Sequence, residues 1–111
     1  METENKRETF NDIIQGDKPV LIDFFAEWCE PCKLMKPILS ELRQKLGDKI
    51  RILKIDVDLS PEVSSAFNIQ SVPTLMLIHN KNIVWRQAGV MQANQLENII
   101  NQFLVKSNNE L

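Results

Sequence analysis

The chain has 111 residues, of which 43% are hydrophobic and 25% charged, and its net charge is −2. These values are typical of a soluble globular domain and argue against a nucleic-acid surface, which needs a basic face. No apolar run approaches the length of a membrane span, and the polar start METENKRETF lacks the apolar centre of a signal peptide. We expect a cytoplasmic protein with one domain over residues 1–111, with terminal segments at about 1–8 and 105–111.

The first half of the chain alternates helical and extended patterns. Thr9 can cap a short helix that Gly16 ends. Residues 19–26, PVLIDFFA, are a nearly continuous apolar run, as expected for a strand buried on both faces. Apolar residues then recur at helical spacing until Gly47, which predicts a longer helix: Leu34, Ile38, Leu39, Leu42 and Leu46.

The second half predicts three more strands and two more helices. Residues 49–58 are expected to form a strand, and Ser60 to cap a short helix that has Pro61 at its first position. The segments TLMLIH and IVWRQAG predict two strands joined by a hairpin at residues 80–82. An apolar stripe predicts the last helix: Leu96, Ile99, Ile100, Phe103 and Leu104.

The order of these elements predicts the fold class. An early strand–helix–strand unit implies a right-handed parallel crossover. The late hairpin adds antiparallel pairing, so the sheet is mixed. We therefore expect an α/β fold with a central mixed β-sheet flanked by helices on both faces.

Both cysteines lie in AEWCEPCK, residues 26–33, with two residues between them. A disulfide that closes so small a loop removes little chain entropy, so a purely structural staple is unfavoured. A structural zinc site needs four ligands, and the only histidine is the distant His79, so we expect no metal. An inert buried pair stays open as an alternative. A redox-active pair is the leading interpretation.

The position of the pair predicts how the two sulfurs differ. They lie between the carboxyl end of a buried strand and the amino end of a helix, where free N–H groups and the helix dipole stabilise an anion. Cys29 lies at or just before the first turn, so its thiolate is favoured and it is the expected nucleophile. Cys32 lies one turn further in, is expected to be more shielded, and resolves the mixed disulfide.

The segments PVLIDFFAEW, WCEPCK and SVPTL, taken together, resemble the thioredoxin family from about Thr9 to Leu104. The resemblance implies the thioredoxin fold and a protein-disulfide reductase that uses a reversible Cys29–Cys32 disulfide. It implies a flavoprotein thioredoxin reductase as electron donor. The chain has no Gly-rich dinucleotide fingerprint, so we expect no bound cofactor. A monomer is the default expectation.

Asp23 is a carboxylate inside the apolar run, so it must be paired or have a raised pKa. The resemblance matches it to the family's buried acid, and Lys54 to the lysine on the neighbouring strand. Lys54 is thus the expected partner, and a purely structural ion pair is one interpretation. The functional interpretation is that Asp23 relays a proton to or from Cys32 through water. Asn at position 23 is then expected to slow disulfide exchange, most at low pH.

The resemblance also predicts the substrate surface. Pro73 matches the family's cis proline opposite the cysteines, Gly89 its groove glycine, and Pro37 the proline that kinks the active-site helix. A cis Pro73 turns the Val72 backbone toward the cysteines, where an extended substrate segment can pair with it. A flat apolar patch is expected to surround the motif, comprising Trp28, Pro31, Val57, Val72, Gly89 and Val90.

Two positions depart from the family pattern. Glu30 replaces the usual glycine between the cysteines, and the hairpin at residues 80–82 lacks a glycine, although asparagine tolerates positive φ. Glu30 is either a solvated helix-start residue or a modulator whose charge disfavours the Cys29 thiolate. In the second case the protein is a stronger reductant by about 10–20 mV.

Two rival functions remain open. An oxidase or isomerase of the same fold favours histidine between its cysteines, where this chain has Glu30 and Pro31. A redox-silent binding subunit would use the same apolar patch and would keep its function without the cysteines.

Overall fold

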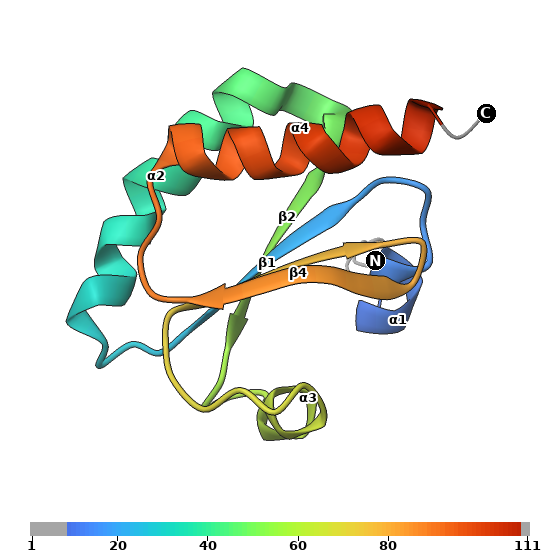
Figure 1. Cartoon of the computed structure of the whole chain (residues 1–111). Coiled ribbons are helices and arrows are strands. Elements are labelled where there is room, and N and C mark those ends of the chain that lie inside the picture. The colour runs from blue at the N-terminus through green and yellow to red at the C-terminus, as the bar shows by residue number, and fades with distance from the viewer. Residues whose placement is uncertain (1–8, 110–111) are drawn as a thin grey trace, which may run out of the picture.

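The computed structural model describes the chain from residue 9 to residue 109, and side chains as far as residue 104. The described elements follow in this order: α1 Phe10–Ile14, β1 Val20–Phe25, α2 Glu30–Leu46, a 3₁₀ turn η2 Gly47–Lys49, β2 Arg51–Asp56, α3 Pro61–Ala66, β3 Thr74–His79, β4 Asn82–Ala88 and α4 Ala93–Asn109 (Figure 1). Strand and helix types agree with the sequence pattern throughout, and most bounds differ by one or two residues.

The four described strands form one mixed sheet in the order β2-β1-β3-β4. β1 pairs parallel with β2, while β3 is antiparallel to both β1 and β4. The α/β fold with a mixed sheet is confirmed. The central position of β1 explains its apolar sequence, because every residue of the strand except Phe25 is buried.

Helices cover both faces of the sheet, as expected (Figure 1). One core lies between the sheet and the pair α2 and α4, and is represented by Leu21, Leu42 and Leu96. The other lies between the sheet and the shorter α1 and α3, and contains Ile22 and Phe24. Successive residues of β1 serve opposite cores because side chains alternate across a strand.

Local signals set the element ends, with one exception. Thr9 Oγ1 accepts a hydrogen bond from Asp12 N at 3.0 Å, and Asp12 Oδ2 accepts one from Thr9 N at 3.1 Å, which completes a capping box. Ser60 occupies the N-cap position of α3, but its side chain makes no capping hydrogen bond, so the predicted cap is wrong in that respect. The first turn of α3 is favoured instead by Pro61, whose ring fixes a helical φ.

The β3–β4 hairpin turns without glycine. Asn80 and Lys81 have φ values of 55° and 70°. The tolerance expected of asparagine is confirmed at position 80. Lys81 takes the same left-handed conformation, which the sequence does not signal.

The expected terminal segments are described only in part. Residues 1–8 and 110–111 lie outside the described residues. α4 continues to Asn109, so residues 105–109 of the expected terminal segment are part of the last helix. Between residues 9 and 109, no helix combines the length and the apolar character that a membrane crossing requires.

Candidate active site

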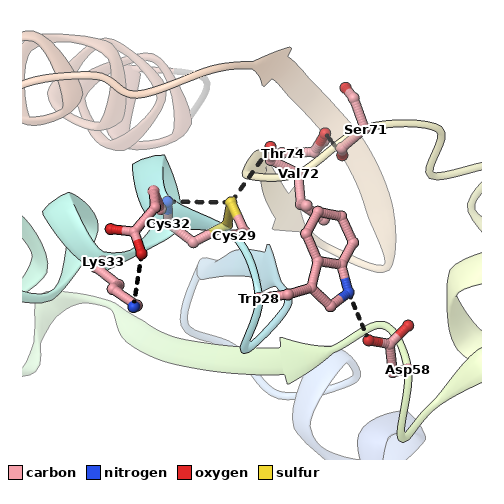
Figure 2. Close-up of a disulfide and its surroundings, with 9 residues drawn as sticks. Trp28, Cys29, Cys32, Lys33, Asp58, Ser71, Val72 and Thr74 are labelled. Carbon is pink, nitrogen blue, oxygen red and sulfur yellow. Dashed lines mark hydrogen bonds and ion pairs between the residues drawn. A yellow bond between two sulfur atoms is a disulfide. The ribbon is translucent and has the colours of Figure 1, made fainter.

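The two cysteines begin α2. Cys29 is its N-cap, with extended backbone, and its Sγ accepts a hydrogen bond from Cys32 N at 3.1 Å. A disulfide joins Cys29 to Cys32, with the Cα atoms 5.3 Å apart (Figure 2). The sulfur therefore occupies the place of a capping oxygen at the positive end of the helix dipole. A thiolate formed there on reduction keeps these stabilising interactions.

Burial does not separate the two cysteines as expected. Cys29 is 3% exposed and Cys32 is 6% exposed, so the prediction that Cys32 is the more shielded residue is wrong for the disulfide form. Both cysteines are buried, and the Val72 carbonyl oxygen lies 3.6 Å from Cys29 Sγ. What separates the sulfurs is their surroundings: Cys29 faces the Val72 backbone, whereas Cys32 borders a hollow at the start of α2.

The segment before β3 lies opposite the cysteines. The Val72–Pro73 peptide bond is cis, as predicted. Gly89 N donates a hydrogen bond to Pro73 O at 2.8 Å, which ties the segment to the end of β4. Gly89 has a φ of 100°, a conformation that side-chain-bearing residues rarely adopt. This glycine thus shapes the backbone beside the disulfide, in agreement with its predicted position.

Trp28 stands at the surface beside the disulfide. Its side chain is 70% exposed, and its Nε1 donates a hydrogen bond to Asp58 Oδ2 at 2.9 Å (Figure 2). Asp58 follows β2 in a turn where Asp58 N donates to Asp56 Oδ1 at 2.9 Å. The sequence indicated no role for Asp58, because the turn signal at this place belongs to Asp56, whose side chain accepts from the Asp58 backbone.

The predicted apolar patch forms in part. Val57 and Val72 pack against the buried cysteine cluster, and Pro31 is exposed in the first turn of α2. Val90 packs instead against the core beneath α2 and α4. The patch beside the disulfide therefore consists of Trp28, Pro31, Val57, Val72 and the Gly89 backbone, without Val90.

Asp23 is fully buried in β1, and neither of its carboxyl oxygens has a hydrogen-bond partner among the residues that the structure describes. Burial raises the pKa of Asp23 from 3.8 to about 6, and the positive charge of Lys54 opposes this rise. A carboxyl group with a pKa near neutrality can both take up and release a proton under physiological conditions.

Lys54 lies opposite Asp23 in the parallel register of β1 and β2. Its side chain is exposed, and its Nζ lies 4.8 Å above the centroid of the Phe25 ring. The expected direct ion pair with Asp23 is therefore absent among the described contacts. The reason is that a long ammonium side chain keeps its charge in water and packs its stem on apolar surface.

Glu30 is the first residue of α2 and is exposed. Its Oε2 accepts a hydrogen bond from Lys33 Nζ at 3.0 Å, and the two side chains also form an ion pair. Sequence analysis did not anticipate this partner, although residues three apart share a helix face. Lys33 offsets part of the negative charge that Glu30 brings to the cysteines.

The structure thus contains a disulfide at a helix N-terminus, a backbone segment against one of its sulfurs and, in β1, a buried carboxyl group with a raised pKa. These are the parts that dithiol–disulfide exchange needs. No group of three His, Cys, Asp or Glu side chains within the described part of the chain is arranged to hold a metal ion.

Comparison with known proteins agrees with this chemistry. The family model described as Thioredoxin matches residues 2–102. The chain belongs to the thioredoxin family. It is 46% identical over 88 residues to a thioredoxin of Alicyclobacillus acidocaldarius, covering 79% of this chain and 84% of that protein. It is 43% identical over 106 residues to the chloroplastic thioredoxin Y2 of Arabidopsis thaliana, covering 91% of this chain and 64% of that protein.

Solved structures of the family share the fold. A mutant thioredoxin from Halobacterium salinarum superposes with a TM-score of 0.75 at 31% identity, covering 82% of this chain and 79% of that one. Family membership and the Cys29–Cys32 disulfide together make the chain a thiol-disulfide oxidoreductase.

Proposed function

We propose that this thioredoxin acts as a protein-disulfide reductase. The Cys29 thiolate attacks a substrate disulfide, the substrate S–S bond breaks, and one substrate thiolate leaves and takes up a proton. The Cys32 thiolate then attacks Cys29 Sγ in the mixed disulfide and releases the second substrate thiolate. The substrate gains two electrons, and the protein is left with the Cys29–Cys32 disulfide.

The observation that carries the proposal is the contact of Cys29 Sγ with the Val72 carbonyl oxygen beside the exposed Trp28. An extended substrate segment can align with the Val72 and Gly89 backbones, while its apolar side chains contact Trp28, Pro31 and Val57. Because the contacts are to the substrate main chain and to apolar side chains, the surface accepts substrates that expose a disulfide and depends only weakly on their amino-acid sequence.

Asp23 is proposed to act on the second step. Cys32 must lose a proton before it can attack, and the unpartnered buried carboxyl group is suited to take that proton through water. Lys54 is a positioning residue in this scheme, because its charge opposes the rise in the Asp23 pKa. Glu30 is proposed as a modulator, and it holds Lys33 at the helix start.

The remaining assignments are also proposals. We infer that the protein binds no cofactor, receives electrons from a flavoprotein thioredoxin reductase and works as a monomer. We place it in the cytoplasm, where a reducing pool favours the dithiol form. An oxidase or isomerase role is less well supported, because the residues between the cysteines are Glu30 and Pro31, without histidine.

The test is a redox titration of the protein in glutathione buffers, followed by reduction of a protein disulfide with single and double cysteine variants. We expect a strongly reducing potential, no activity in Cys29→Ser, and a trapped mixed disulfide in Cys32→Ser. A strongly oxidising potential would contradict the reductase assignment. Retention of function in the double serine variant would favour the redox-silent binding subunit.

A further inference from the structure

A hollow of about 250 Å³ borders Cys32 on the side away from Val72, between the start of α2 and the β1–α2 loop. Three of its seven lining residues are lysines, namely Lys33, Lys36 and Lys54. The remaining lining residues are Phe25, Ala26, Glu27 and Cys32. Positive charge is thus concentrated beside the inner sulfur of a protein whose net charge is −2.

The lysines reach the hollow from two elements. Lys33 and Lys36 are three residues apart on α2 and therefore share one face of that helix, while Lys54 comes from β2. All three are exposed, and two of them have partners: Lys33 pairs with Glu30, and Lys54 lies over the Phe25 ring. Glu27 adds one negative charge to the lining.

We propose that this hollow is a specificity subsite that binds a carboxylate side chain next to the disulfide of a substrate protein. The inference rests on the proposed reductase function and adds a preferred substrate class, namely disulfides flanked by Asp or Glu. A lysine ammonium suits this role, because it is a flexible point charge with three donors that meets a carboxylate without fixed geometry.

The geometry allows both contacts at once. A substrate sulfur bonded to Cys29 lies next to Cys32, which lines the hollow. An extended chain advances about 3.3 Å per residue, so a residue one or two positions from the substrate cysteine stays within about 7 Å of it along the chain, and the hollow that contains the lysines begins at Cys32 itself. Val72 then aligns the backbone on one side of the disulfide while the lysines hold the carboxylate on the other.

The test compares three synthetic peptides that contain one disulfide and differ only in the residue after the second cysteine, which is Asp, Asn or Lys. The rate constant kcat/KM for reduction of each peptide is measured at about 0.02 M and about 0.5 M salt. At low salt we expect the Asp peptide to react about three- to tenfold faster than the Asn peptide, since each exposed charge pair contributes little and several act together. High salt should reduce this ratio toward one.

Lys36 is the residue to change, because it has no assigned part in the exchange chemistry. Lys36→Gln should lower the Asp-to-Asn ratio about twofold and leave the Asn peptide unaffected. Lys49→Gln, at the far end of α2 in η2, is the matched control and should change neither rate. Glu30→Gln releases Lys33 from its ion pair and should raise the ratio.

Equal rates for the Asp and Asn peptides in the wild-type protein would overturn the proposal, as would an equal loss for both peptides in Lys36→Gln. The proposal would also be overturned if Lys36→Gln slowed the reduction of oxidised glutathione but not that of the Asp peptide. The hollow would then bind the carboxylates of a small disulfide and not a side chain of a substrate protein. Failure of the reductase function gives a different result, in which the Asn peptide is not reduced by the wild-type protein.

Discussion

Trp28 Nε1 donates a hydrogen bond of 2.9 Å to Asp58 Oδ2, and this bond joins the β1–α2 loop to the β2–α3 turn. The indole is otherwise 70% exposed beside the disulfide. An aromatic side chain with one polar anchor can thus present its apolar face to a substrate without rotating away.

The Trp28 position predicts a redox-dependent signal. Oxidation should lower the fluorescence of Trp28, because the disulfide beside the indole quenches it. Trp85→Phe should keep this change, since Trp85 packs on the core beneath α2 and α4, and Trp28→Phe should abolish it. Emission spectra of the oxidised and reduced forms provide the measurement. If Trp85→Phe abolished the redox-dependent change and Trp28→Phe kept it, Trp28 would not lie beside the cysteines in solution.

Asp23→Asn should stabilise the protein at neutral pH. Burial raises the pKa of Asp23 from 3.8 to about 6, so the unfolded chain loses this proton first as pH rises. Below about pH 4 the carboxyl is protonated in both states and does not lower the free energy of unfolding. As pH rises from about 4 through 6, ionisation favours the unfolded chain, and above both pKa values the free energy of unfolding is lower by about 3 kcal/mol. Asparagine cannot ionise and avoids this cost.

Urea denaturation of both proteins between pH 3 and pH 8 measures this effect. The free energies of unfolding should coincide near pH 3 and diverge by about 2–3 kcal/mol in favour of Asp23→Asn near pH 8. A difference that does not depend on pH would mean that the substitution acts through packing and not through ionisation.

The same pKa determines how Asp23→Asn affects the exchange rate. Well below pH 6 the carboxyl of Asp23 is protonated and cannot take a proton from Cys32, so the variant should approach the wild-type rate there. Above pH 6 it should be slower, by about tenfold or more. This reverses the expectation, drawn from the sequence, that the loss is greatest at low pH.

Lys54→Gln serves as the companion variant in that pH–rate profile. The Lys54 charge lowers the pKa of Asp23, so its removal should move the Asp23-dependent limb to higher pH without abolishing it. A profile that keeps its midpoint in Lys54→Gln would contradict an electrostatic role for Lys54.

Glu30→Gln should make the protein a weaker reductant. Removing a negative charge from the first turn favours the Cys29 thiolate, and the expected change in potential is about 10 mV in the less negative direction. This lies at the lower end of the range expected from the sequence, because Lys33 pairs with Glu30 at 3.0 Å. Equilibration with glutathione at low and high salt measures the change, which should fade as salt rises. A shift in Glu30→Gly alone would assign the effect to backbone geometry.

Lys81→Gly should stabilise the hairpin. Lys81 has a φ of 70°, where a Cβ atom is unfavourable and glycine is not. We expect the free energy of unfolding to rise by about 0.5–1 kcal/mol, measured by thermal or urea denaturation. The disulfide lies at the opposite end of β3 from this turn, so the exchange rate should not change. Lys49→Gly, outside the hairpin, is a control that should bring no gain.

The sequence alone determined the elements and the reactive pair. Some signals depend only on residues that are close together in the sequence and can therefore be read from it directly. They are the apolar run over β1, the helical spacing in α2 and α4, and the turn at Asn80. The position of Cys29 at a helix start and the burial of Asp23 follow from the same short-range signals. The cis Val72–Pro73 bond was predicted only through the family resemblance.

The tertiary structure decided which side chains meet across distant segments. Trp28 and Asp58 are 30 residues apart, and Cys29 and Val72 are 43 apart, so no local pattern could pair them. Lys54 lies in register with Asp23 but extends toward Phe25 and solvent, because an ammonium group is costly to bury. The lysine hollow beside Cys32 likewise exists only because the α2 crossover brings β2 next to β1. The direction of a side chain depends on the residues packed around it, and these neighbours cannot be read from the order of residues in the sequence.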